Sequence, residues 1–127
     1  MTQVQMHGIS NCDTIKKAKK WLVDASIEFD FRDYKKQPPS RNELQQWIGH
    51  VGWETLLNKR GTTWRKLSTA QQDAVNEDTV CALLEEYPSM IKRPLLVMQP
   101  HQAKQNDQQI QAFVGFNAEQ YTTIFKL

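Results

Sequence analysis

The fold is decided by residues 4–32, which read VQMHGISNCDTIKKAKKWLVDASIEFDFR. Residues 4–6 alternate apolar and polar side chains, with the period of two expected of a short strand. From Ile15 to Ala25 apolar residues recur at helical spacing on one face. Alternation returns from Ile27 to Phe31, the pattern of a second half-buried strand. A strand, a helix and a strand within about thirty residues form a βαβ unit, so the two strands are predicted to be parallel.

A helical middle follows this unit. Pro38-Pro39 ends the βαβ pattern, and Ser40 with Glu43 three residues later is the capping-box signature that opens a helix. Glycines then divide the chain into short helices, and the apolar spacing from Ala70 to about Glu86 predicts one further helix. We therefore expect a helical insertion over about residues 40–90.

Two apolar runs follow the insertion. Leu95 to Met98 is continuously apolar, as in a strand covered on both faces, and Ile110 to Phe116 is the second run. The polar stretch between them, from Gln99 to Gln109, predicts the exposed loop of an antiparallel hairpin. A last helix carries Tyr121 and Phe125 on one side. The order βαβ, helices, ββα indicates one α/β domain over residues 1–127, built on a mixed four-stranded sheet.

Charge and cysteine count exclude several classes of protein. A net charge of +2 over 127 residues is too small for an electrostatic nucleic-acid binder. No apolar run approaches the ~18 residues that a membrane span needs, and the N-terminus lacks the basic start and apolar block of a signal peptide. Cys12 and Cys81 cannot by themselves form a disulfide scaffold or a four-ligand zinc site. We expect a cytoplasmic, soluble protein with free thiols and no metal.

Cys12 is the residue that carries chemistry. It follows a strand and a turn and opens a helix, where unpaired backbone N–H groups and the helix dipole favour a thiolate. Lysines follow in the first turns of the helix. Lys16 lies four residues on, and its side chain leans toward the N-terminus, so its ammonium can approach the sulfur. A blander interpretation stays open, in which the lysines form a solvated face and Cys12 is a small filler residue.

Cys81 differs from Cys12 in its setting. It lies beside the apolar face of the helix expected from Ala70 to about Glu86. A buried thiol on such a face behaves as a small, inert hydrophobe, so Cys81 is a poor candidate for resolving an oxidised Cys12. An oxidised Cys12 would then need a thiol supplied from outside the chain.

Three segments resemble a known family. Residues 8–18, Gly8-Ile9-Ser10-Asn11-Cys12-Asp13-Thr14-Ile15-Lys16-Lys17-Ala18, look like the active-site segment of the arsenate reductase-like (ArsC/Spx) family. Residues 59–62, Lys59-Arg60-Gly61-Thr62, and 91–96, Ile91-Lys92-Arg93-Pro94-Leu95-Leu96, resemble its two other signatures, in the same order. The resemblance implies a thioredoxin-like fold with a helical insertion. Within the subgroup that has the N-C-D-T segment, it implies a glutathione-linked thiol reductase.

The resemblance assigns roles residue by residue. Cys12 corresponds to the nucleophile, and Arg60 and Arg93 correspond to the residues that bind an anion, for which the fixed fork of a guanidinium is suited. Pro94 corresponds to a proline that is commonly cis and presents backbone groups beside the sulfur. Asn11 would cap the helix or orient a substrate, with capping the simpler role.

Two departures from the family pattern bear on the substrate. In the arsenate reductases a third arginine follows the glycine of the last strand, whereas here Phe116 follows Gly115. This favours a larger, partly apolar thiol or disulfide over arsenate. Some Spx regulators carry a C-x-x-C switch, and here Ile15 stands in place of its second cysteine. The alternative function that the resemblance leaves open is an Spx-like regulatory module that binds RNA polymerase.

These observations lead to one functional hypothesis. The chain is expected to be a cysteine-dependent reductase of glutathione-linked disulfides or of an arsenate-type oxyanion, with Cys12 as nucleophile and an external thiol as reductant. No tightly bound cofactor is expected, and glutathione is the co-substrate. The expected partners are glutathione or glutaredoxin and a small anion or disulfide substrate. Neither nucleic acid nor a membrane is expected as a partner, and the protein is expected to be a monomer.

Overall fold

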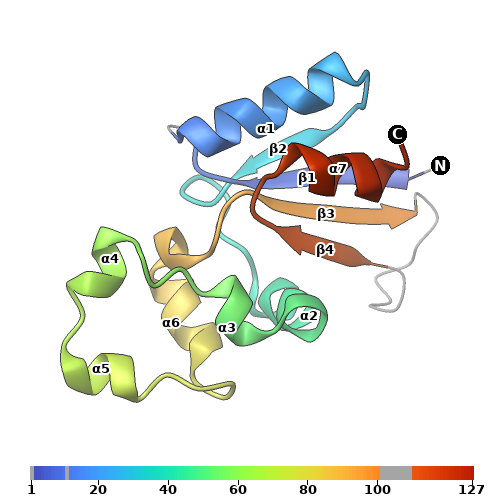
Figure 1. Cartoon of the computed structure of the whole chain (residues 1–127). Coiled ribbons are helices and arrows are strands. Elements are labelled where there is room, and N and C mark those ends of the chain that lie inside the picture. The colour runs from blue at the N-terminus through green and yellow to red at the C-terminus, as the bar shows by residue number, and fades with distance from the viewer. Residues whose placement is uncertain (1, 11, 101–109) are drawn as a thin grey trace.

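A mixed sheet forms the centre of the molecule. The computed structural model describes residues 2–10, 12–100 and 110–127. Within these ranges the strands are β1 (Thr2–Gly8), β2 (Asp30–Asp33), β3 (Leu95–Pro100) and β4 (Gln111–Val114), in the order β2-β1-β3-β4 (Figure 1). β1 is parallel to β2 and antiparallel to β3, and β3 is antiparallel to β4. Both predicted pairings are confirmed. The predicted loop from Gln99 to Gln109 falls for the most part outside the described residues.

Two helices cover one face of the sheet. They are α1 (Asp13–Asp24) and α7 (Ala118–Phe125), which lie on the same side of the strands in Figure 1. Asn117 caps α7 by accepting the N–H groups of Glu119 and Gln120. The alternate residues of β1 and β3 that face these helices complete a core made of Val4, Met6, Ile15, Ala18, Leu22, Leu96 and Tyr121.

The helical middle covers the opposite face. It consists of α2 (Arg41–Val51), α3 (Trp53–Leu56), α4 (Thr62–Arg65), α5 (Thr69–Asp73), α6 (Val80–Glu86) and the 3₁₀ turn η1 (Pro88–Met90). The predicted capping box is present, since Ser40 Oγ accepts the Glu43 N–H and Glu43 Oε1 accepts the Ser40 N–H. The second core includes Tyr34, Leu44, Trp47, Leu56, Leu57, Val80, Cys81, Leu84, Met90, Ile91, Leu95, Val97, Ile110 and Ala112.

One predicted helix is two helices. The sequence spacing predicted a single helix from Ala70 to about Glu86, whereas the chain turns between α5 and α6. The side chain of Asn76 accepts the N–H groups of Asp78 and Thr79, and the Thr79 hydroxyl donates to the Ala74 carbonyl. Such side-chain bonds give the backbone an alternative to the helical ladder, and this breaks the helix.

The second strand is also shorter than predicted. Alternation indicated a strand from Ile27, but the ladder with β1 starts at Asp30. Ser26, which follows α1, has φ of 58°, so the chain is still turning there. Ile27 and Phe29 nevertheless pack, partly buried, against the core under α1. Their alternation reflects burial rather than strand pairing.

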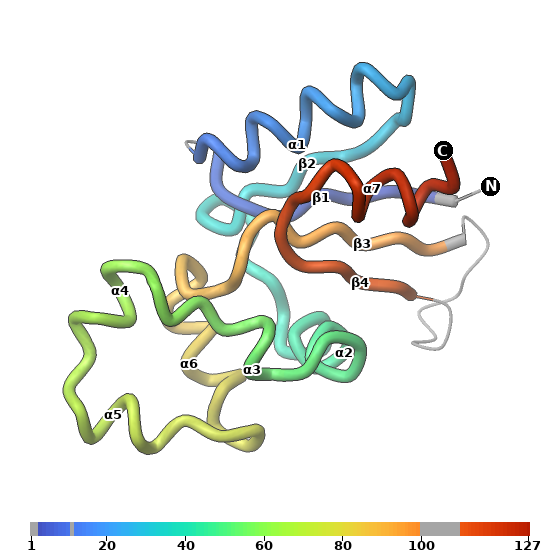
Figure 2. Tube along the Cα trace, viewed as in Figure 1, coloured from blue at the N-terminus to red at the C-terminus, as the bar shows by residue number. Residues whose placement is uncertain are grey.

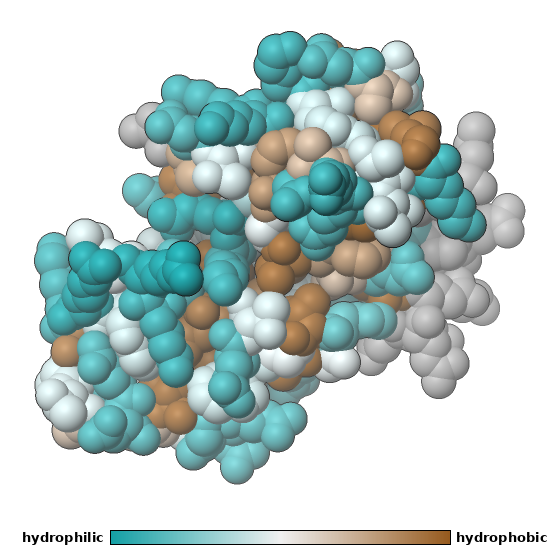
Figure 3. All heavy atoms as spheres, in the orientation of Figure 1, coloured by the Kyte–Doolittle hydropathy of each residue, from teal (hydrophilic) through white to brown (hydrophobic). Residues whose placement is uncertain are grey.

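The face of the molecule seen in the orientation of Figure 1 is mostly polar. Hydrophilic residues cover most of the face seen in Figure 3, and apolar side chains show below α7 and at several points over the helical middle. The described helices include none that is both long and apolar enough to cross a bilayer.

Candidate functional site

Cys12 lies where β1 passes into α1. The chain leaves β1 at Gly8 and reaches Cys12, the N-cap of α1, which has extended backbone angles (φ −135°, ψ 128°). The Cys12 carbonyl accepts the first helical bond, from the Lys16 N–H at 3.1 Å. Cys12 is a free, partly exposed thiol. The prediction that it opens a helix after a strand and a turn is therefore confirmed.

Gly8 makes this arrangement possible. A Cβ placed on Gly8 would lie only 2.4 Å from Cδ1 of Ile15, and 3.7 Å from Cβ of Arg93. A side chain at this position would therefore force the Ile15 side chain, in the first turn of α1, to move. The Ile15 side chain therefore packs closely on the end of β1 because residue 8 has no side chain, and Arg93 lies at ordinary contact distance from the same position.

The surroundings of Cys12 favour its thiolate. Burial raises the pKa of this thiol, but the net pKa lies below the usual value of cysteine. The opposing groups are, in order, the N–H of Ile15, the guanidinium of Arg93 and the N–H of Thr14, with the charge of Arg93 adding to them. A helix leaves such first-turn N–H groups without backbone partners. Because the neutral thiol closes no capping hydrogen bond, these donors remain for an anion.

Arg93 reaches the sulfur from the segment before β3. Its Nη1 donates to the carbonyl of Ser89 in η1 at 2.9 Å, which holds the side chain in place. The Arg93–Pro94 peptide bond is cis, and the buried Pro94 keeps its carbonyl bonded to the Gly115 N–H at 2.8 Å. The structure thus brings Cys12 and Arg93 together and places Pro94 next to Arg93.

Arg60 lies on a neighbouring segment. Leu57 and Ile91 form an isolated antiparallel bridge, and the Asn58 N–H donates to the Met90 carbonyl at 2.7 Å. This bridge ties the loop that carries Arg60 to the segment that carries Arg93. The Arg60 backbone N–H donates to the Asn58 side chain at 3.0 Å, and the residue is exposed. Its guanidinium makes no ion pair among the described residues, and it is not among the groups that shift the pKa of Cys12.

Two other candidates contribute differently. Lys16 is exposed on α1, and the groups that lower the pKa of Cys12 are backbone N–H groups and Arg93 rather than the lysines. Asn11 lies outside the described residues, and the N-cap of α1 is Cys12.

Phe116 packs inward instead of lining an anion site. Its ring meets Tyr121 edge-on at 4.8 Å between centroids, within the core under α1 and α7. Cys12 touches the same core from its edge. The position at which arsenate reductases have a third arginine therefore belongs here to an apolar cluster near the thiol.

Sequence reasoning missed a support behind Arg93. Thr63 Oγ1 in α4 and Ser89 Oγ in η1 lie 2.9 Å apart, and the Ser89 carbonyl is the one that holds Arg93. In Figure 2 the start of α1, the yellow-orange segment before β3 that contains η1, and α4 all lie toward the left of the view. Thr63 follows the Lys59-Arg60-Gly61-Thr62 segment directly, which is the one signal that could have pointed to it.

His7, next to Gly8, is buried on the other side of the sheet. It is 1% exposed, stacks on Tyr34 and meets Trp47 edge-on. Neither ring nitrogen has a hydrogen-bond partner. Burial, helped by the charge of Arg32 and opposed by Glu43, lowers the pKa of His7 to about 4. His7 is thus a neutral core residue at physiological pH.

Within the described ranges, no three His, Cys, Asp or Glu side chains gather as metal ligands would.

Comparison with known proteins extends these findings. The ArsC family model matches residues 7–124. An uncharacterized protein of Haemophilus influenzae is 38% identical over 122 residues, covering 96% of this chain and 98% of the relative. The structure titled YFFB (PA3664) protein has a TM-score of 0.80 and 37% identity, over 95% of this chain and 97% of its own.

A second structure is titled an arsenate reductase (ArsC) related protein from Brucella melitensis. It has 39% identity and a TM-score of 0.70, over 98% of this chain and 96% of its own. More distant relatives, at 24–27% identity, are named global transcriptional regulator Spx. The sheet order, the helical middle and these likenesses establish the thioredoxin-like fold expected from the sequence. With a family model that matches residues 7–124 and relatives of 37–38% identity that cover 95–96% of the chain, the protein belongs to the ArsC family.

Proposed function

We propose that this protein is a cysteine-dependent reductase that exchanges thiols and disulfides with glutathione. One observation carries the proposal: Cys12 is partly exposed at the N-cap of α1, and first-turn N–H groups together with Arg93 lower its thiol pKa. A thiolate is the nucleophile in disulfide exchange, and a thiol whose pKa approaches the ambient pH attacks fastest.

The reaction has two exchange steps. The Cys12 thiolate attacks one sulfur of a glutathione-containing disulfide, a Cys12–glutathione S–S bond forms, and the other half leaves as a thiolate. An external thiol, glutathione or glutaredoxin, then attacks this mixed disulfide. Cys12 leaves as the thiolate, and the external thiol ends in a new disulfide. The two electrons come from the external thiols, since Cys81 is buried in the second core.

Arginines bind the substrate in this proposal. Arg93 lies beside the sulfur and serves both the thiolate and an anionic group of the substrate. Arg60, exposed on the loop tied to the Arg93 segment, supplies a second guanidinium for a carboxylate. An arsenate-type oxyanion is the second substrate class. It is less well served, because Phe116 is packed against Tyr121 where the arsenate reductases have a third arginine.

Disulfide exchange kinetics test the proposal. The measurement is turnover of the mixed disulfide of glutathione with 2-mercaptoethanol, of a glutathionylated peptide and of arsenate, each with glutathione and glutaredoxin present. Wild type and Cys81→Ser should turn over at similar rates, whereas Cys12→Ser should show only the background rate. If wild type is no faster than Cys12→Ser on all three substrates, the protein is not this reductase.

A regulatory role is the second candidate, favoured by the relatives named Spx. In that case the chain is a module that docks on RNA polymerase, and Cys12 is not needed for docking. Retention of purified RNA polymerase on immobilised protein, equal for wild type and Cys12→Ser, would favour this role. Absence of retention together with Cys12-dependent turnover would favour the reductase.

A further inference from the structure

A groove lies beside the Cys12 site and is not used by the chemistry described above. It has a volume of about 410 Å³ and is lined by Ser10, Phe31, Asp33, Lys36 and Gln37. Ser10 is two residues from Cys12, so their Cα atoms are within about 7 Å of each other. Phe31 and Cys12 also pack on the same core. A molecule whose sulfur reacts at Cys12 can therefore extend directly into this groove, which we call the Phe31 groove.

One wall of the groove is held by the turn after β2. The Lys35 N–H donates to Asp33 Oδ1 at 2.8 Å, and the N–H groups of Lys36 and Gln37 donate to the Asp33 carbonyl. The Tyr34 N–H donates to the Gly8 carbonyl at 2.8 Å, which fastens this turn to the end of β1.

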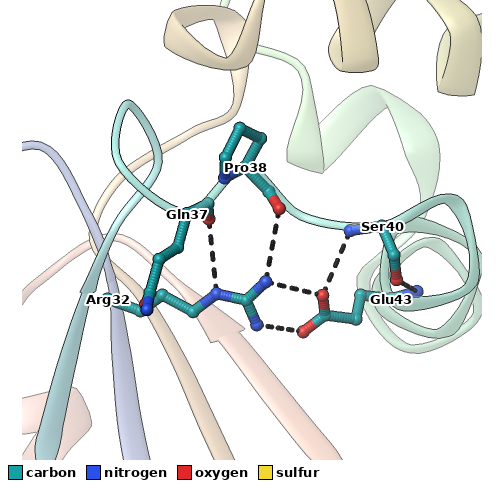
Figure 4. A network of polar contacts seen from close by, with 5 residues as sticks. All are labelled: Arg32, Gln37, Pro38, Ser40 and Glu43. Atoms are coloured by element: carbon teal, nitrogen blue, oxygen red, sulfur yellow. Dashed lines mark hydrogen bonds and ion pairs between the residues drawn. The ribbon is translucent and has the colours of Figure 1, made fainter.

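A second set of contacts, made by the side chain of Arg32, holds the same turn against α2. Arg32 forms a two-pronged ion pair with Glu43 of α2, and its guanidinium also donates to the carbonyls of Gln37 and Pro38 at 3.3 Å (Figure 4). The Arg32–Glu43 pair is about one-quarter exposed. The backbone of the groove wall is thus held in place before any ligand binds.

The charges around the groove suit a carboxylate. Asp33 is already engaged by the Lys35 N–H, and burial of its carboxyl is outweighed by hydrogen bonds from Lys35 and Ser10, so its pKa is lowered. Lys36 forms no ion pair with Asp33 among the described contacts, and its charge also lowers the pKa of that carboxyl. A second ammonium, that of Lys19, lies 3.6 Å from the centroid of the Phe31 ring. The lining of the groove therefore combines the aromatic ring of Phe31, the ammonium group of Lys36 and the carboxylate of Asp33.

From this arrangement we infer that the Phe31 groove binds a carboxylate-bearing arm of glutathione while the glutathione sulfur reacts at Cys12, an inference that rests on the proposed function. Lys36 pairs with the carboxylate, and the Phe31 ring packs against the planar peptide groups. The Ser10 hydroxyl, which donates to Asp33, keeps an acceptor oxygen for a peptide N–H, and Gln37 offers its amide. A lone oxyanion would leave the aromatic face of this groove unused, whereas a small peptide fills it.

The main experiment compares two disulfides that react by the same chemistry. Rate constants for Cys12 are measured with glutathione disulfide, which has carboxylates, and with bis(2-hydroxyethyl) disulfide, which is neutral. Lys36→Gln should slow glutathione disulfide about fivefold, the scale of one exposed ion pair, and leave the neutral disulfide unchanged. Lys35→Gln removes the same charge from the adjacent exposed residue and should change neither rate.

The outcomes separate the groove from the proposed function. Equal slowing of both disulfides by Lys36→Gln, or no slowing of either, overturns the groove assignment while leaving the reductase intact. If wild type reacts with neither disulfide, the proposed function fails. The groove is then decided by binding of S-methylglutathione to Cys12→Ser, followed by amide chemical shifts. The groove assignment is upheld if the amide signals of residues 31 and 36 shift on titration and the affinity obtained from these shifts falls about fivefold in Lys36→Gln. It is overturned if these signals do not shift.

Discussion

Cys12 and Cys81 each lie at the start of a helix, yet their thiols are tuned in opposite directions. Cys12 is the N-cap of α1, and Cys81 is the second residue of α6. The pKa of Cys12 is lowered, because N–H groups and Arg93 outweigh its burial. The pKa of Cys81 is raised by burial, with Arg41 lowering it and Glu85 raising it. Closeness to a helix N-terminus is therefore not enough to activate a cysteine.

The difference comes from where each side chain points. An N-cap side chain can turn back over the N–H groups of the first turn, whereas a residue inside the helix projects sideways. In α6 that sideways direction leads into the second core, and Cys81 is 6% exposed. In α1 the N-cap faces the first-turn N–H groups and Arg93. Two positions along the helix separate a thiol with a lowered pKa from one with a raised pKa.

Selective alkylation is the strongest test of this contrast. With iodoacetamide at pH 7, Cys12 should react on the order of a hundredfold faster than Cys81, because it is both exposed and more ionised. Peptide mass spectrometry at timed quenches measures both rates, and in denaturant the two should become equal. Since the pKa of Cys12 is lowered, its rate should rise with pH and level off below the pKa of free cysteine, about 8.5. A rate that keeps climbing past this value would contradict the lowered pKa.

Removal of Arg93 should make the alkylation rates of Cys12 and Cys81 more similar. In Arg93→Gln the pKa of Cys12 should rise, since a charge and a hydrogen-bond donor are lost, and alkylation at pH 6.5 should slow roughly five- to tenfold. Arg60→Gln is the matched control and should leave the alkylation rate unchanged while slowing glutathione disulfide. A similar loss of alkylation rate in both variants would mean that general positive charge, rather than the Arg93 contact, tunes Cys12.

Serine substitutions should affect stability with opposite signs at the two sites. Cys81→Ser should lower the free energy of unfolding by about 1–2 kcal/mol, because a hydroxyl enters an apolar core. Cys12→Ser should raise it by about 0.5 kcal/mol at pH 5, because serine is a good N-cap and the thiol closes no cap bond.

The difference in the free energy of unfolding between Cys12→Ser and wild type should change with pH in one direction. The folded pKa of Cys12 is lowered, so thiolate stabilisation of wild type appears as pH rises through that value and is complete above the unfolded pKa. The advantage of serine should therefore shrink between pH 5 and about 9. Urea unfolding of the three proteins at several pH values measures both effects. A Cys12→Ser variant less stable than wild type at pH 5 would show that the thiol itself supports the fold.

Sequence patterns predicted the position of Cys12 at the start of a helix, but they did not predict which groups lower its pKa. Periodicity predicts where β1 ends and α1 begins, so the N-cap position follows from local order along the chain. The donors that tune the thiol do not follow in the same way. The lysines of α1 were the nearest positive charges in sequence, whereas the charge that lowers the pKa of Cys12 is that of Arg93, from the segment before β3. Only the family resemblance pointed to Arg93, since periodicity carries no information on such long-range contacts.

The same limit applies to the helical middle. The helix expected from Ala70 to about Glu86 hid the fact that Cys81 lies in a first turn, because the break depends on the side-chain bonds of Asn76. Burial of Cys81 was nevertheless predicted correctly from the apolar face around it. Apolar spacing reports which side faces the core, whereas helix ends depend on individual polar contacts.

The smallest predicted effect concerns the support behind Arg93. Thr63→Val removes the hydroxyl that meets Ser89 Oγ at 2.9 Å, and the carbonyl of Ser89 holds Arg93 Nη1. With η1 less firmly placed, Arg93 spends less time at the sulfur, so alkylation of Cys12 at pH 6.5 should slow about two- to threefold, consistent with one lost hydrogen bond. The shape-matched control is Thr62→Val, an exposed neighbour in α4.

The double variant decides whether Thr63 acts through Arg93. If it does, Thr63→Val should slow alkylation no further once Arg93→Gln is present, because the group that Thr63 positions is already gone. Additive losses would instead mean that Thr63 affects Cys12 by another route. Cys81 should be unaffected in every variant, since its surroundings on α6 include neither Thr63 nor Arg93. Thr63 of α4 would then be shown to affect the pKa of Cys12 and not the thiol of Cys81.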